Sequence, residues 1–230
     1  MTGSAGLVGS AVVRGLRALG RPVVGVDRLP SAAAGVSRFV YTSSTSVYGH
    51  ALVPKDGAVR VTEDVTCRPR DIYDETKLAA EHLALSASGT SGAAGTRTPV
   101  TMSTLCLRIA RSFPEPPAVL ARHRLYRGVD LADVTEAHLL AVHAPEGADG
   151  VLNIAGPYPW RAADRKELWL DPATLITRRL PQVAAGFARS GWELPASIDR
   201  VYVSERAESV LGYRPRHGIS ALLAGARATG

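Results

Sequence analysis

The spacing of apolar and polar residues along the chain predicts helices that alternate with strands. Three segments carry apolar residues every three or four positions, as amphipathic helices do: 10–19, 71–86 and 130–143. Four short apolar runs have the composition of buried strands: 23–27, 39–44, 100–109 and 151–155. Strands that alternate with helices in this way indicate an α/β fold with a mainly parallel sheet.

Glycine and proline indicate where these elements end. Gly20 closes the first predicted helix. Pro54 and Pro69 interrupt residues 50–70, which we interpret as a loop. Two further segments are interpreted as irregular, a linker and a mobile surface loop: 29–37 and 88–98. Beyond residue 155 the sequence predicts short helices separated by proline-rich turns.

Composition limits the class of protein. Of the 230 residues 46% are hydrophobic and 21% charged, which is too apolar for a disordered chain. No apolar run approaches the roughly 18 residues of a membrane span, and the first charged residue, Arg14, comes too late for the basic start of a signal peptide. Cys67 and Cys106 are too few for a disulfide framework. We therefore expect a soluble, cytoplasmic protein with reduced thiols and no membrane partner.

Charge favours neither a nucleic-acid interface nor a metal site. The chain has 27 basic and 21 acidic residues, a formal net charge of +6. Three of the basic residues are lysine, so 24 are arginine, and these are scattered rather than gathered in a stripe. His138 and His143 are five positions apart, which places them on different faces of a helix, and no other histidine has ligand spacing. We expect no bound metal.

A glycine-rich motif precedes the first predicted helix. Gly3, Gly6 and Gly9 form GxxGxxG, a pattern that lets the backbone approach a pyrophosphate where free N–H groups and the helix dipole favour anions. Asp27 follows Gly9 by eighteen residues and ends a predicted strand, near the spacing at which a carboxylate binds the adenosine ribose. This acid favours NAD over NADP, although the adjacent Arg28 weakens the choice. The alternative for Asp27 is an ordinary turn acid.

A second motif, YxxxK, lies near the start of the helix predicted at 71–86. Tyr73 and Lys77 are four residues apart and share one helix face, so the ammonium can lower the pKa of the phenol toward that of a general base. Ser44 ends a strand upstream and can donate a hydrogen bond to a substrate oxygen. The alternatives are an exposed helix pair and a capping serine, with three rival hydroxyl residues nearby: Ser43, Thr45 and Ser46.

The order of these motifs resembles the extended short-chain dehydrogenase/reductases, and more narrowly the NAD-dependent sugar epimerase/dehydratase family. Six stretches carry the resemblance: Thr2–Gly9, Asp27, Tyr41–Gly49, Tyr73–Lys77, Leu107–Ile109 and Asn153–Gly156. It covers residues 2 to about 156 and is weaker beyond, where Gly191-Trp192 and Leu211–Pro215 are similar to the substrate region of the family.

The resemblance implies a Rossmann-like, mainly parallel sheet with a small C-terminal substrate-binding region. It divides the chain into an NAD-binding domain, 1–111 plus 129–155, and a substrate-binding region, 112–128 plus 156–230. It implies a catalytic triad of Ser44, Tyr73 and Lys77. The cofactor-binding residues expected for NAD are Gly3, Gly6, Leu7, Val8, Gly9, Asp27, Arg28, Tyr73 and Lys77.

The expected substrate is a small molecule, in the first instance a nucleotide sugar. The dehydratases of the family usually have an acid after the triad serine, where this chain has Thr45 and Ser46, so an epimerase or simple oxidoreductase is favoured. The resemblance offers three arginines as candidates to face the diphosphate of the substrate: Arg108, Arg111 and Arg206. For each of them, a surface or ion-paired role is favoured. The family often dimerises through the YxxxK helix, which makes a homodimer possible.

The chain is short for this family. The glycine motif starts at residue 2, so we expect the strand that precedes it in the family to be missing. Only seventeen positions separate Asp27 from Ser44, where the family has two strand–helix units of about 30 residues each. Three consequences are open. The surviving strands pair directly with one another, a partner chain supplies the missing strands, or the chain no longer binds NAD well. The segment Ser112–Pro117 also replaces a glycine-containing turn near the substrate.

Three functions therefore remain as hypotheses from the sequence. The first is an NAD-dependent epimerase of sugars, and the second a ketone or alcohol oxidoreductase of secondary metabolism on the same scaffold. The third is a non-catalytic or repurposed protein. The intact set of Ser44, Tyr73 and Lys77 favours an enzyme, whereas the lost strands favour the third.

Overall fold

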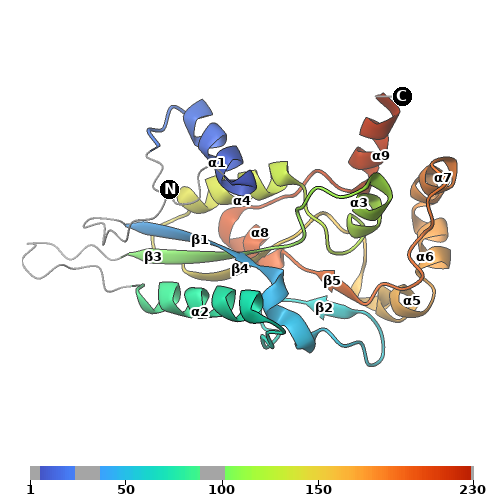
Figure 1. The fold of residues 1–230 in the computed structure, drawn as a ribbon, viewed down its shortest axis with the longest axis horizontal. Helices are drawn as coiled ribbons and strands as arrows, with labels where there is room; N and C mark the ends of the chain where they lie inside the picture. The colour runs from blue at the N-terminus through green and yellow to red at the C-terminus, as the bar shows by residue number, and fades with distance from the viewer. Residues whose placement is uncertain (1–5, 24–36, 89–101, 229–230) are drawn as a thin grey trace, which may run out of the picture.

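The computed structural model of the chain describes residues 6–23, 37–88 and 102–228, and it has the α/β fold that the sequence predicts (Figure 1). The helices are α1 (Leu7–Ala18), α2 (Ile72–Ser86), α3 (Pro117–His123), α4 (Leu131–Val142), α5 (Arg165–Leu170), α6 (Pro172–Arg179), α7 (Pro181–Arg189), α8 (Glu205–Leu211) and α9 (Ile219–Ala228). The strands are β1 (Arg38–Ser44), β2 (Val59–Val61), β3 (Ser103–Ile109), β4 (Gly150–Ile154) and β5 (Arg200–Tyr202). Short 3-10 helices cover Thr45–Ala51 and Ala162–Asp164.

The central sheet is parallel and has the strand order β1–β3–β4. β1 pairs with β3 along its whole length, from Arg38 opposite Ser103 to Ser44 opposite Ile109. All seven residues of β3 are buried, because α2 packs on one face of the sheet and α4 on the other (Figure 1). The carboxyl ends of parallel strands meet at one edge of the sheet, and this edge is where such folds bind ligands.

The helices predicted from apolar spacing are confirmed as α1, α2 and α4. α1 begins three residues earlier than predicted, at Leu7. Gly20 ends it as predicted, since its φ of 69° lies in the left-handed region and its N–H donates to the carbonyl of Arg17. Asp71 caps α2, and its carboxylate accepts a hydrogen bond from the N–H of Asp74 at 3.0 Å.

Three of the predicted strands are confirmed as β1, β3 and β4, but the prediction of a loop throughout 50–70 is wrong. Val59–Val61 forms β2, which pairs in parallel with β5 near the C-terminus. A three-residue strand carries too short a local pattern to be recognised, and its partner lies far away in the sequence. The predicted strand at 23–27, the linker at 29–37 and nearly all of the loop at 88–98 fall outside the described residues.

Within the described residues β1 pairs with β3 alone, so none of them extends the sheet beyond β1. α1 packs across α4, on the same side of the sheet (Figure 1). Gly15 makes this close approach possible: a Cβ at this position would lie 3.0 Å from the side chain of Leu139. The glycine-motif helix is therefore held in place by α4.

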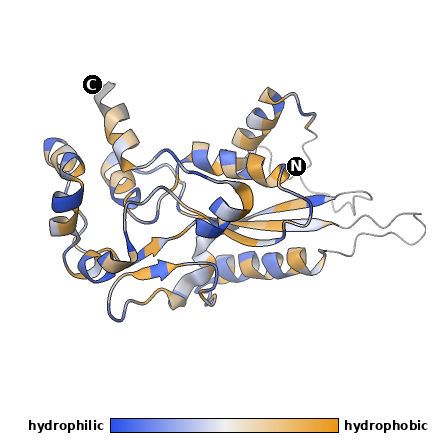
Figure 2. Cartoon of the chain, turned by 180° about the vertical axis from the view of Figure 1, so that it is seen from behind, coloured by the Kyte–Doolittle hydropathy of each residue, from blue (hydrophilic) through white to orange (hydrophobic). Residues whose placement is uncertain are grey.

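Two hydrophobic cores stabilise the chain. The first surrounds the central sheet and includes Leu105, Leu107 and Ile154. The second lies among the C-terminal helices and includes Leu175 and Phe187. Hydrophobic residues dominate the strands and alternate with hydrophilic ones along the helices (Figure 2). The predicted division into an NAD-binding and a substrate-binding part stays a prediction. In the described part of the chain, no helix has the length and apolar character needed to cross a membrane.

A buried ion pair joins α2 to the central strand. Arg108 of β3 donates to both carboxylate oxygens of Glu81, at 2.9 and 2.7 Å, and both side chains are almost completely buried. The guanidinium also lies 4.8 Å from the ring centroid of Tyr48. Arg108 therefore has the ion-paired role that the sequence analysis favours for it over one facing a diphosphate.

Candidate functional site

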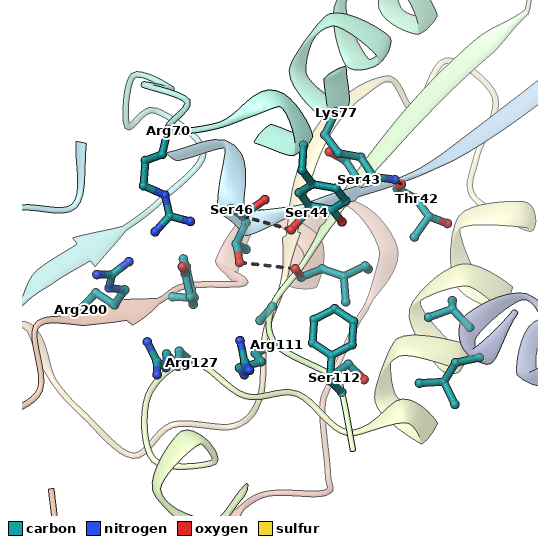
Figure 3. A pocket seen from close by; sticks show the side chains of 18 residues that line it. Thr42, Ser43, Ser44, Ser46, Arg70, Lys77, Arg111, Ser112, Arg127 and Arg200 are labelled. Carbon is teal, nitrogen blue, oxygen red and sulfur yellow. Dashed lines mark hydrogen bonds between the residues drawn. The ribbon is translucent and has the colours of Figure 1, made fainter. Parts of the chain in front are cut away.

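A cavity of about 460 Å³ opens at the carboxyl ends of β1 and β3 (Figure 3). Its wall includes the three residues of the catalytic triad that the family resemblance implies: Ser44, Tyr73 and Lys77. Leu7 and Val8, from the start of α1, also line it. The structure thus brings the YxxxK motif, the hydroxyl residues of β1 and the helix that follows the glycine motif to one site.

Ser44 is the last residue of β1 and the N-cap of the 3-10 helix that follows. Its Oγ accepts a hydrogen bond from the N–H of Ser46 at 3.1 Å, so its hydroxyl proton is free to be donated into the cavity. Among the rival hydroxyls, Thr45 donates to the carbonyl of Ile109 at 3.4 Å. Ser43 and Ser46 have buried hydroxyls without a partner among the described residues. Ser44 therefore serves as a cap and still keeps a proton to donate.

Tyr73 and Lys77 lie in the first two turns of α2, on the face toward β1. The ammonium of Lys77 lies 5.9 Å from the ring centroid of Tyr73 and donates to the carbonyl of Thr42 at 2.8 Å. Burial lowers the pKa of Lys77, and the opposing effect of Glu81 does not cancel this. Tyr73 is 50% exposed and lines the cavity.

A buried histidine supports the strand that holds Lys77. Nε2 of His138 in α4 lies 2.8 Å from Oγ1 of Thr42, and its Nδ1 lies 2.8 Å from the carbonyl of Val134. The carbonyl can only accept, so Nδ1 carries the proton and Nε2 accepts from the Thr42 hydroxyl. Burial lowers the pKa of His138. The imidazole is therefore neutral in the folded protein.

This burial predicts a loss of stability in acid. The pKa of His138 is lower in the folded chain than its unfolded value of about 6.5, so its contribution is complete above pH 6.5 and is lost progressively as the pH falls below it. We expect the free energy of unfolding in urea to decrease below pH 6.5, and His138→Gln to reduce that slope. His50→Gln, which changes an exposed histidine, should leave the slope unchanged; an equal effect of both variants would contradict the assignment.

The N-terminus of α1 has the features of an anion site. Gly6 is its N-cap and provides no side-chain cap, and the first turn has no acidic residue, so the N–H groups of this turn stay available. Leu7 and Val8 line the cavity, whereas Gly9 is buried within the helix. The other residues expected to bind the cofactor lie outside the described residues: Gly3, Asp27 and Arg28.

The sequence analysis missed most of the arginines that line the cavity. Arg70, Arg127 and Arg200 lie with Arg111 on the side across from Lys77 (Figure 3). They come from separate loops and strands, so no local motif identifies them. Arg206 has the ion-paired role that the sequence analysis favours, because it pairs with Asp64 at 2.8 Å and does not line the cavity. Over the ranges that the structure describes, no group of three potential metal ligands occurs.

Comparisons with known proteins agree with this architecture. A sequence model of the NAD dependent epimerase/dehydratase family matches residues 31–110, which confirms the resemblance inferred from the motifs. A search of curated proteins gave no match. One similar structure is MoeE5 in complex with UDP-glucuronic acid and NAD, with 22% identity and a TM-score of 0.60 over 100% of this chain and 98% of that chain.

Two further structures show the same likeness. A short-chain dehydrogenase/reductase superfamily protein from Agrobacterium tumefaciens with bound NAD is 21% identical, with a TM-score of 0.63 over 99% of this chain and 95% of that chain. UDP-glucuronic acid 4-epimerase from Bacillus cereus in complex with NAD is 15% identical, with a TM-score of 0.58 over 96% of this chain and 94% of that chain. At these identities the similarity establishes the Rossmann-like fold.

Proposed function

We propose that this chain is an NAD-dependent enzyme acting on a nucleotide sugar, because it resembles the NAD dependent epimerase/dehydratase family in both sequence and fold. The observation that carries the proposal is the single cavity shared by Ser44, Tyr73, Lys77 and the N-terminus of α1. The similar structures named above bind NAD and, in one case, a nucleotide sugar, which supports this choice of cofactor and substrate.

In the proposed reaction Tyr73 holds and moves a proton. Its phenolate oxygen takes the proton from a substrate hydroxyl as the carbon that carries this hydroxyl becomes a carbonyl. The ammonium of Lys77 is held by the Thr42 carbonyl and favours the phenolate by its charge. The Ser44 hydroxyl, whose proton is not used elsewhere, donates a hydrogen bond to the same substrate oxygen and orients it.

The residues present fit a dinucleotide. The uncapped N–H groups of α1 would hold the pyrophosphate, and Lys77, which has donors left beyond the Thr42 carbonyl, would hold the nicotinamide ribose. Bound NAD would supply the acceptor for the hydride that leaves the substrate carbon. The chain itself supplies orientation and charge around that carbon.

The cavity favours an epimerase or oxidoreductase over a dehydratase. None of the described residues that line it is aspartate or glutamate, so no carboxylate is placed to assist loss of water. Thr45, which follows the triad serine, is also engaged with the Ile109 carbonyl. An epimerisation would need no further acid, because Tyr73 would return the proton that it took to the same substrate oxygen.

A second candidate is a repurposed protein that has kept the site but lost turnover. It is favoured by the central sheet, in which the described residues supply three strands and β1 pairs on one side only. Absence of saturable binding at millimolar NAD would contradict the enzyme. If NAD binds, turnover of a nucleotide sugar decides between the two candidates, because only the enzyme converts it.

A charge placed at the start of α1 tests the cofactor site directly. We expect Gly6→Asp to weaken NAD binding about tenfold or more, because its carboxylate would occupy the N–H groups and repel the pyrophosphate. Gly6→Asn is the matched control, since asparagine caps a helix as well as aspartate but adds no charge. Isothermal titration of each variant with NAD gives the comparison. Equal affinities for the two variants would place the pyrophosphate elsewhere.

A further inference from the structure

One end of the cavity is rich in arginine and free of acid. Three of its four arginines are paired with carboxylates behind the wall: Arg70 with Asp74, Arg111 with Glu115 and Arg200 with Asp199. Arg127 has no carboxylate partner among the described residues, and its Nε is buried without an acceptor. Of these four arginines, Arg127 is therefore the one whose charge is not neutralised by a carboxylate of the described residues.

Arg127 is nevertheless held in place, by a histidine. Its guanidinium Nη2 lies 2.6 Å from Nε2 of His123, and Nδ1 of His123 lies 2.5 Å from Oε2 of Glu115. A guanidinium only donates and a carboxylate only accepts, so Nε2 must accept and Nδ1 must carry the proton. His123 is thus a neutral imidazole whose tautomer is fixed from both sides.

The far end of this chain of hydrogen bonds is also fixed. Glu115 is almost buried, and its other oxygen, Oε1, accepts from Nε of Arg111 at 2.6 Å. Burial raises the pKa of Glu115, but the hydrogen bonds from His123 and Arg111 outweigh this and lower it. The carboxylate therefore stays ionised. It lies in the segment Ser112–Pro117, where the sequence departs from the family.

A neutral partner has a specific consequence for Arg127. A carboxylate in the place of His123 would orient the guanidinium and cancel its charge, whereas an imidazole orients it and leaves the charge available. The long side chain of Arg127 is also ordered before a ligand binds, so that binding costs less conformational entropy. These properties suit a side chain that binds an anion and not one that only stabilises the fold.

We propose that Glu115 and His123 are positioning residues that hold Arg127 to bind a negatively charged group of the substrate, at the end of the cavity across from Lys77. This inference rests on the proposed function for the identity of the site. The ligand chemistry is that of an oxyanion, carried either by phosphoryl groups or by carboxylates. Arg127 is then a specificity-determining residue, and neutral sugars or alcohols are poor substrates.

The test uses the full chain and two probes, inorganic pyrophosphate and malonate, titrated calorimetrically without NAD. We expect Arg127→Met to weaken binding of the preferred probe about 10- to 100-fold, the range expected for losing charged hydrogen bonds. Arg178→Met is the control, because it removes the same charge from an exposed arginine of α6. Repeating the titrations in the Gly6→Asp background removes the start of α1 as a competing anion site.

Variants of His123 separate positioning from a structural role. His123→Leu should weaken binding nearly as much as Arg127→Met, whereas His123→Gln, which keeps an acceptor for Arg127, should retain most of the affinity. In the Arg127→Met background His123→Leu should add no further loss, since it acts only through Arg127. With turnover measured, these losses should appear in KM more than in kcat.

The outcomes are distinct. Loss of pyrophosphate binding assigns the site to phosphoryl groups and loss of malonate binding assigns it to carboxylates; either supports the proposal. It is overturned if neither probe saturates, if Arg127→Met behaves as Arg178→Met does, or if His123→Leu has the same effect in both backgrounds. Because the titrations contain no NAD, failure of the cofactor proposal leaves this result readable, and the converse also holds.

Discussion

Replacing Tyr73 by phenylalanine is expected to lower kcat by about 100- to 10,000-fold, the contribution of a positioned general acid–base group, while NAD binds nearly as before. The phenol is the proposed proton carrier of the site, and the change removes one oxygen while keeping the ring that faces Lys77. Turnover is followed as reduction of NAD or as interconversion of the sugar, and binding by titration. A loss of affinity equal to the loss of turnover would mean that Tyr73 holds the cofactor rather than a proton.

Tyr41 provides a matched control for this experiment. Its ring centroid lies 5.1 Å from the ammonium of Lys77, closer than that of Tyr73, but Tyr41 does not line the cavity. Burial and the nearby Glu81 also raise the pKa of Tyr41, which keeps its phenol protonated. Tyr41→Phe should therefore leave kcat close to that of the unmodified chain. If Tyr73→Phe and Tyr41→Phe lower kcat equally, the loss comes from a change around the ammonium of Lys77 and not from removal of the Tyr73 oxygen.

Glu81→Gln is expected to destabilise the fold by about 3–5 kcal/mol, the usual cost of leaving one member of a buried ion pair without its counter-charge. The amide has the shape of the carboxylate, so packing is kept, but the guanidinium of Arg108 stays in the core beside the Tyr48 ring without its counter-charge. Urea unfolding gives the free energy. A change below about 1 kcal/mol, typical of exposed pairs, would mean that Arg108 reaches water.

Two comparisons identify burial as the cause. Glu167→Gln breaks an arginine–glutamate pair with the same 2.7 Å separation, but on the surface, and should change stability little. Replacing both partners in the core, Glu81→Leu with Arg108→Met, should recover most of the loss, because it removes both charges and keeps apolar volume. If the double variant is as unstable as Glu81→Gln, the loss comes from packing.

Much of this site was accessible from the sequence because its signals are local. Tyr73 and Lys77 share a helix face by their spacing alone, and Ser44 is placed by the end of a strand. Asp71, a residue with a side chain suited to capping, marks the start of α2. The assignment of these residues to catalysis stays a prediction until Tyr73→Phe is measured.

The sequence by itself determined the α/β class, the order of the main helices and strands, and the grouping of the triad candidates, since periodicity and short motifs depend on neighbouring residues. Only the tertiary structure decided which arginines face the cavity and which are used elsewhere. Arg108 and Arg127 look alike in sequence, yet one is neutralised by Glu81 in the core and the other is held by a neutral His123 at the cavity wall. The physical reason is that the free charge of an arginine depends on its partners, and those partners come from segments that only folding brings together.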